Sequence, residues 1–295
     1  MFRVGDVAYT WDDVVERARV CGIWSQLEDD VRGGLAALRE LDARGESPDE
    51  DDVEAAARSF RYARGLLAGD ELDAWLDSRG LTTGGWEDHL RRSLARDLVP
   101  DADPAGEDPA AHVWAEGICS GTLERLAHDL ATLVAVAPDA AADDRDDVYE
   151  SFCRAAATDA AIAREIESNR LEWIRLRYDA VVLADEDSAA EAALCVRSDG
   201  DALSAVAERI GVDVEERLDW LDEVEPELAS RFLAADAGAL VGPVAVEDGF
   251  LIGHLLAKTS PTADDDDVRE RAAEAVGLRA ASRAVNDRVV WLEPV

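Results

Sequence analysis

The side chains that most often carry catalysis or bind metals are few in this chain and lie far apart. The first three of its four histidines fall on separate predicted helices without the paired spacing of metal ligands: His89, His112, His128 and His254. Its four cysteines are equally scattered: Cys21, Cys119, Cys153 and Cys195. The sequence also lacks the GxSxG, HExxH and GxGxxG patterns. We therefore expect no metal and no cofactor, and the hydrolase, zinc-protease and dinucleotide-binding classes receive little support.

The most distinctive stretch runs from Leu176 to Lys258. It reads as an apolar strand, an Ala-rich helix, a second helix, an LDWL segment, a helix opened by Glu-Pro-Glu and a hairpin. The hairpin carries LVGPV and, after a turn, GFLI. This stretch resembles the parvulin-type peptidyl-prolyl isomerases. The resemblance implies a small α/β domain, an antiparallel sheet flanked by helices, over residues 171–260.

The same resemblance indicates where catalytic groups belong, and most are replaced here. The family has a histidine just after the Gly-aromatic pair, where this chain has Leu251, and another on the first strand, at about Ala180. A serine that often precedes the hairpin histidine corresponds to about Asp248. His254 lies three residues beyond Leu251, so strand alternation places it on the opposite face. Asp213 matches the family's aspartate and is the remaining candidate catalytic residue, although it reads equally well as a turn or cap residue.

The pocket for a proline ring is better preserved than the catalytic groups. The resemblance assigns its floor, its flank and a neighbouring aromatic position to six residues: Leu218, Val224, Leu228, Phe250, Leu251 and Trp220. These are our candidate peptide-binding residues, and the competing interpretation is that all six simply form the core. Rotation about a prolyl amide has a barrier of about 18–20 kcal/mol, and a catalyst must place polar groups around the twisting bond. Replacing histidine by leucine and alanine therefore favours holding an extended or hydrophobic segment over catalysis.

The charge of the chain is extreme. It has 66 acidic against 30 basic residues, a formal net charge of −36, and the acidic residues are spread along the whole length. Salt would screen the resulting self-repulsion, so we interpret the chain as a salt-adapted, haloarchaeal, cytoplasmic protein. The alternative is an acidic surface that steers a basic partner. Neither interpretation suits binding to nucleic acid or to an anionic bilayer. We see no secretory signal and no apolar window long enough for a membrane span.

Outside the parvulin-like stretch the periodicity is helical. We expect a large helical domain over residues 1–170, including helices over about 110–136 and one long helix over about 147–177, and a C-terminal helix and strand over 261–295. The final strand, RVVWL, could pair with the first, FRVGDVAY. Helical ends enclosing a parvulin-like unit resemble the SurA-like foldases, which implies an α+β fold whose two ends form one chaperone domain. The segment from Ser59 to Arg92 is also similar to parvulin-related peptide-maturation proteins.

Three functions fit these observations. The leading one is a foldase or chaperone that binds unfolded or precursor polypeptides and has a degenerate isomerase site. The second is a divergent but active prolyl isomerase that uses Asp213. The third is an accessory subunit of a peptide-maturation or export system, in which the parvulin-like unit recognises a leader peptide. The identity of the client and the oligomeric state are left open by the sequence.

Overall fold

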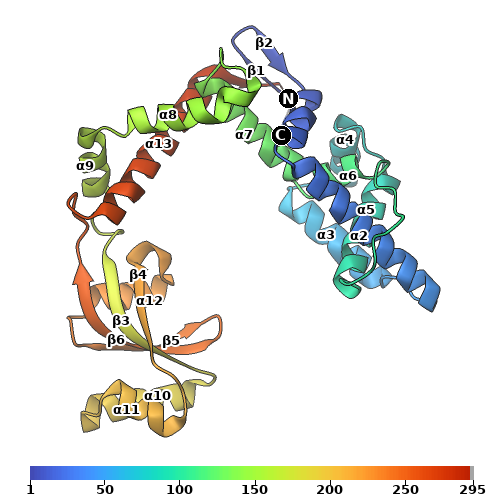
Figure 1. Cartoon of the computed structure of the whole chain (residues 1–295). Coiled ribbons are helices and arrows are strands. Elements are labelled where there is room, and N and C mark those ends of the chain that lie inside the picture. The colour runs from blue at the N-terminus through green and yellow to red at the C-terminus, as the bar shows by residue number, and fades with distance from the viewer. Residues whose placement is uncertain (293–295) are drawn as a thin grey trace. The chain divides into compact units, whose positions relative to one another are not determined.

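The structure is a computed structural model that describes residues 1–292, apart from the side chain of Asp143. The chain divides into two compact units (Figure 1). The first comprises Met1–Tyr149 together with the chain from Ala281 onward, and the second comprises Glu150–Ala280. The second unit is therefore inserted into the sequence of the first. Two helices cross the division along the chain: α8 (Arg145–Ala156) and α13 (Asp266–Arg288).

A small sheet in the first unit joins the two ends of the chain. Its strands run antiparallel in the order β2-β1-β7, with the bounds β1 (Phe2–Val4), β2 (Val7–Tyr9) and β7 (Val289–Trp291). Phe2 is opposite Tyr9 on one side and Trp291 on the other, and the ring of Phe2 contacts both of the other rings. The pairing expected between the first and last strands is therefore present.

Helices form the rest of the first unit and pack around a large apolar core. They are α1 (Trp11–Val20), α2 (Ile23–Arg44), α3 (Glu50–Ala63), α4 (Gly69–Ser78), α5 (Thr83–Leu98), α6 (Val113–Cys119), α7 (Thr122–Val136) and the short η1 (Ala142–Asp144). A smaller apolar cluster lies between α2 and α5. Thr10 caps the start of α1, because its backbone N–H and hydroxyl both donate to Asp13. The helices expected over about 110–136 are present as α6 and α7. The chain turns at Gly121, whose φ of 74° a residue with a side chain rarely adopts.

The long helix expected over 147–177 is wrong. Instead α8 ends at Ala156, α9 covers Asp159–Ser168, and a strand begins at Arg175. Thr158 has extended backbone angles, and its side chain accepts a hydrogen bond from the backbone N–H of Ala161. This N-cap starts a new helix where the apolar spacing alone continues.

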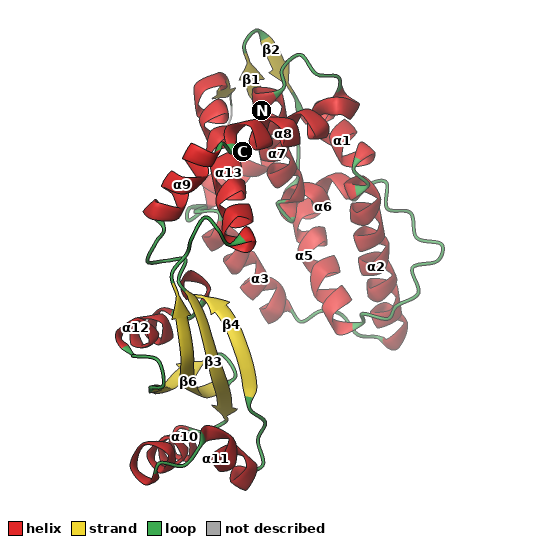
Figure 2. Ribbon diagram, turned by 60° about the vertical axis from the view of Figure 1, so that its left-hand side comes forward, coloured by secondary structure: helices red, strands yellow, loops and turns green. Residues whose placement is uncertain are grey.

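The second unit contains a four-stranded antiparallel sheet between helices (Figures 1 and 2). The strand order is β4-β3-β6-β5, with the bounds β3 (Arg175–Leu183), β4 (Glu215–Trp220), β5 (Leu240–Val246) and β6 (Gly249–Thr259). One face packs on α10 (Glu186–Leu194) and α11 (Leu203–Ile210), and the other packs on α12 (Pro226–Ala234). Two short turns complete the unit: η2 (Cys195–Asp199) and η3 (Leu221–Glu223). The expected α+β class, with an antiparallel sheet flanked by helices, is confirmed.

The only lysine of the chain fixes the end of α12. Lys258 on β6 donates from Nζ to the carbonyl oxygens of Phe232, Leu233 and Ala235. The last carbonyls of a helix have no partner inside the helix and carry partial negative charge. This contact therefore ties the helix over the site described below to the central sheet.

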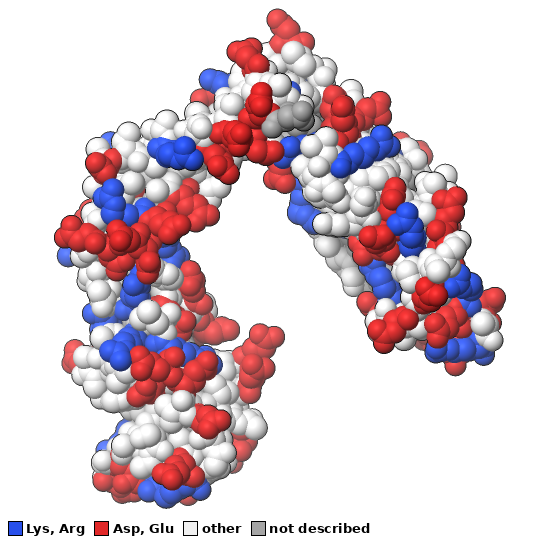
Figure 3. All heavy atoms as spheres, viewed as in Figure 1, with Lys and Arg blue, Asp and Glu red and all other residues white. Residues whose placement is uncertain are grey.

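The surface carries the acidic excess of the sequence. Acidic side chains are spread over both units on the face shown in Figure 3, interspersed with fewer basic ones. Within residues 1–292 no helix combines the length and the apolar character that crossing a membrane requires.

A buried charged cluster lies inside the first unit. Glu116 on α6 is 3% exposed and Arg92 on α5 is 2% exposed, with 3.6 Å between Arg92 Nη2 and Glu116 Oε2. His89 Nδ1 lies 2.9 Å from the same oxygen, and Arg92 also donates to His112. Burial pushes the pKa of Glu116 up, but the contacts with His89 and Arg92 outweigh burial and hold the pKa below its usual value. Glu116 therefore stays ionised and compensates the buried guanidinium.

The substitution Glu116→Ala should destabilise the first unit strongly, because it leaves Arg92 buried without its counter-charge. We expect a loss of about 3–5 kcal/mol in the free energy of unfolding, measured by denaturant titration. The matched control is Glu54→Ala, which removes an exposed carboxylate of α3 and should change stability by less than about 0.5 kcal/mol. Equal effects of the two substitutions would show that the cluster contributes nothing.

Candidate functional site

An open cavity lies on the α12 face of the four-stranded sheet. Its volume is about 320 Å³. Residues from strands β3 to β6, from the β5–β6 turn and from the start of α12 line it: Tyr178, Val182, Arg217, Asp219, Glu223, Val224, Glu225, Leu228, Val246, Glu247, Asp248 and Leu251. The two lining residues from β3, Tyr178 and Val182, are four positions apart and therefore lie on the same face of the strand.

The floor of the cavity is apolar. Leu228 is 2% exposed and Leu251 is 1% exposed, and both belong to the core between the sheet and α12. Val224 is partly buried against the same core and precedes the helix. Pro226 at the first turn of α12 fixes where the helix begins, since its missing N–H would have no helical partner. The sequence therefore positions Val224 and Leu228 on either side of that start.

A hydrogen bond between β3 and β4 forms the polar wall of the cavity. The hydroxyl of Tyr178 donates to Oδ2 of Asp219 at 2.7 Å. Burial and this hydrogen bond to a carboxylate both raise the pKa of Tyr178, so the phenol stays protonated. The ring of Tyr178 is 2% exposed and packs on Phe232 of α12, with 4.6 Å between the ring centroids. Tyr178 is thus held by both its ring and its hydroxyl.

The two positions at which the parvulin family has histidines are apolar and buried. Ala180 is 2% exposed and Leu251 is 1% exposed. On β3 and β6 the register pairs Ala180 with Gly253 and Val182 with Leu251, so both positions point to the α12 face. Asp248, at the position of the family's serine, lines the cavity from the turn between β5 and β6.

The backbone of the hairpin is packed too tightly for side chains at two glycines. A Cβ atom on Gly242 would lie 2.3 Å from the carbonyl oxygen of Leu251, and one on Gly249 would lie 2.3 Å from that of Leu183. Both glycines also have positive φ, at 98° and 137°. Gly242 is therefore needed for the close approach of β5 to β6, and Gly249 for the close approach of β6 to the end of β3.

The structure brings three of the six predicted peptide-binding residues together and places the other three elsewhere. Val224, Leu228 and Leu251 line the cavity. Leu218 pairs with Arg177 on the other face of the sheet and is 62% exposed. Trp220 packs on the core formed by α9 and α13, under the guanidinium groups of Arg175 and Arg271. Phe250 packs on the α10 and α11 face.

The two remaining polar candidates also lie away from the cavity. Asp213 is exposed in the loop between α11 and β4 and is not one of the lining residues. His254 pairs with Leu240 and Asp179 on the α10 and α11 face, as strand alternation predicted, with 4.0 Å between its Nδ1 and Oδ2 of Asp179. The cavity therefore contains no histidine.

Sequence reasoning missed the polar residues of the site. Arg217 and Asp219 lie on β4 and share their face with Tyr178, because Tyr178 is directly opposite Arg217. The alternation Tyr178, Ala180, Val182 on one strand was a usable signal for Tyr178. Arg217 and Asp219 gave no such signal, because the face on which they lie depends on the β3–β4 register, which cannot be read from the sequence. Among the residues that the structure describes, no group of histidine, cysteine, aspartate or glutamate could hold a metal ion.

No family model matches this sequence, and no curated protein matches it. Solved structures are similar to it along most of its length. The peptidylprolyl isomerase PrsA of Bacillus cereus has 13% identity over 94% of this chain and 85% of its own, with a TM-score of 0.33. Foldase protein PrsA of Streptococcus pneumoniae has 13% identity over 96% and 88%, with a TM-score of 0.31. A structure of the SurA-like chaperones of Campylobacter jejuni has 9% identity over 94% and 89%, with a TM-score of 0.24.

The substitution Tyr178→Phe should weaken the second unit by removing the hydrogen bond to Asp219 while keeping the ring. We expect a loss of about 1–3 kcal/mol in the free energy of unfolding, since the acceptor is a half-buried carboxylate. Tyr62→Phe is the matched control, because Tyr62 is 72% exposed and should change stability by less than about 0.5 kcal/mol. An unchanged midpoint for Tyr178→Phe in denaturant would mean that water replaces the hydroxyl without cost.

Proposed function

We propose that this protein binds unfolded or precursor polypeptide segments in the cavity beside Tyr178 and does not catalyse prolyl isomerisation there. The observation that carries the proposal is the composition of the cavity: an apolar floor of Val224, Leu228 and Leu251, and no histidine. Pockets for peptide side chains combine such a floor with a few oriented polar groups. The protein would then act as a chaperone or foldase.

The groups around the apolar floor are poorly suited to catalysis. A prolyl isomerase stabilises the twisted amide with preorganised polar groups. Tyr178 donates its one hydroxyl proton to Asp219, and Leu251 and Ala180 offer only methyl groups. These groups can desolvate and hold an apolar side chain, but they give little to a bond in rotation.

The rim of the cavity favours one class of client. Five carboxylates surround it, namely Asp219, Glu223, Glu225, Glu247 and Asp248, against the single guanidinium of Arg217. Segments that combine an apolar residue with lysine or arginine would satisfy both the floor and the rim. Acidic segments would be repelled.

Binding is tested by suppression of aggregation of an unfolded client and by the affinity for a fluorescent basic-apolar peptide. Val224→Glu, which places a charge at the partly buried edge of the floor, should weaken binding by about tenfold or more, or about 1.4 kcal/mol. Leu194→Glu is the matched control, because Leu194 is 60% exposed on α10, across the sheet from the cavity. Equal binding by both variants would place the client elsewhere.

A tetrapeptide isomerisation assay tests the second candidate function, an active prolyl isomerase, and together with the aggregation assay it tests the third, an accessory subunit. We expect no acceleration over the uncatalysed rate. Acceleration of more than about tenfold that Asp213→Ala abolishes would establish the active isomerase instead, since uncatalysed exchange takes tens to hundreds of seconds. Failure of both aggregation suppression and isomerisation would favour the accessory subunit, which recognises one dedicated leader peptide.

We also propose that the protein works in a salt-adapted cytoplasm, because 66 acidic residues would repel one another at low salt. The Debye length falls from about 10 Å at 0.1 M salt to about 3 Å at 1 M. The thermal unfolding midpoint, followed by circular dichroism, should therefore rise by several degrees between 0.1 M and 2 M KCl. A midpoint that is flat or falls over this range would rule out salt adaptation and would favour a surface that attracts basic partners.

A further inference from the structure

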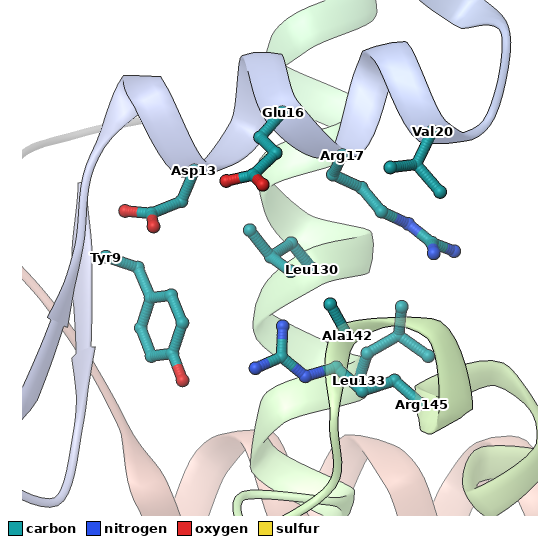
Figure 4. Close-up of a pocket in the computed structure, with 9 residues that line it drawn as sticks. All are labelled: Tyr9, Asp13, Glu16, Arg17, Val20, Leu130, Leu133, Ala142 and Arg145. Carbon is teal, nitrogen blue, oxygen red and sulfur yellow. The ribbon is translucent and has the colours of Figure 1, made fainter.

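A second cavity, in the first unit, holds an arginine whose charge the fold does not use. This cavity has a volume of about 240 Å³ and lies between α1, α7 and the segment that leads into α8. Figure 4 shows the guanidinium of Arg145 reaching into it towards Tyr9, with Arg17 entering from α1. The sides are completed by apolar groups, among them Leu130 and Leu133 of α7.

Arg145 is unusual among the arginines that the structure describes. Its Nε is buried without a hydrogen-bond partner, and within the described part of the chain its side chain forms no ion pair. The other arginines with a buried unpaired nitrogen each have another partner: Arg17 with Asp146, Arg64 with the Cys119 carbonyl, Arg92 with Glu116 and Arg271 with Asp222. In a chain with more than twice as many acidic as basic residues, a partly buried guanidinium without a counter-charge needs an explanation.

Helix stability does not provide that explanation. Arg145 is the first residue of α8. A positive side chain at that end opposes the helix dipole, which favours anions there. Arg145 therefore does not stabilise the start of α8. Its guanidinium points into the cavity instead.

The other charges around the cavity are already engaged or lie in solvent. Arg17 is paired with Asp146 at 2.7 Å. Asp13 accepts hydrogen bonds from the backbone N–H and the hydroxyl of Thr10, so its charge serves the start of α1. Glu16 is exposed and forms no ion pair with Arg145. None of these carboxylates is paired with Arg145, so its guanidinium is free to pair with an anionic group that enters the cavity.

We propose that this cavity binds a carboxylate carried on an apolar stem. Arg145 would receive the carboxylate, since a guanidinium can donate two parallel hydrogen bonds to its oxygens. Leu130 and Leu133, which are 3% and 7% exposed, and the ring of Tyr9 would pack on the stem. At about 30 Å³ per water the volume corresponds to about eight waters, which is enough for one amino-acid residue. The C-terminal residue of a polypeptide and a free organic acid share this chemistry.

Calorimetric titration of the full chain with N-acetyl-leucine and with N-acetyl-leucinamide tests the proposal, because the two probes differ only in the carboxylate. The acid should bind, and the amide should bind at least about tenfold more weakly. Arg145→Gln should lose the preference for the acid, whereas Arg164→Gln, which removes an exposed arginine of α9, should keep it. Equal binding of the two probes, binding of neither at millimolar concentration, or an unchanged preference in Arg145→Gln would overturn the proposal.

If Arg145→Gln folds poorly, thermal unfolding of the unsubstituted chain with each probe still tests the site. The acid, but not the amide, should raise the unfolding midpoint of the unsubstituted chain, and a midpoint unaffected by both probes would count against the site. A third probe distinguishes the two sources of the carboxylate. A tetrapeptide that ends in a free leucine should bind more tightly than N-acetyl-leucine if the ligand is a polypeptide terminus, and no more tightly if it is a free acid. This site is independent of the cavity beside Tyr178, so either can fail alone.

Discussion

Burial of both faces of strands β3 and β6 is the constraint on which the second unit depends. Two helices cover one face and α12 covers the other, so successive residues of each strand enter two different cores. The residues of these strands that lie under the helices have no solvent face on which polar groups can accumulate, whereas Arg177 and Asp179 of β3 keep contact with solvent. Ala180 and Leu251 are therefore core residues in this chain, and the cavity derives its polar groups from the edge strand β4 and from the hairpin turn.

Tyr178 is a core residue of β3 that also contributes a polar group to the cavity. It lies on the central strand β3, but its hydroxyl reaches an edge-strand carboxylate while its ring packs on Phe232. A buried tyrosine needs such a partner for its hydroxyl. The same contact orients Asp219 at the cavity, so the packing of the core and the geometry of the candidate site cannot be changed separately.

The sequence predicted the elements of this fold better than the positions of its side chains. The hairpin, the helix opened by Pro226 and the pairing of the first and last strands follow from local signals or from matched apolar strands. The break at Thr158 was missed because an N-cap hydrogen bond competes with an uninterrupted apolar pattern. Leu218 was assigned to the pocket, but its side chain points away because the β3–β4 register decides its face, and a shift of one residue would reverse that decision.

The pairing of β1 with β7 has a consequence for synthesis of the chain. Val4 is synthesised before the inserted unit and its partner Val289 after it, so the whole inserted unit lies between the two strands. At about 5–20 residues per second, β1 waits on the order of tens of seconds with one edge open. The inserted unit has all its strands within its own stretch and can close during that interval. The inserted unit can therefore fold before β7 completes the sheet that β1 and β2 begin.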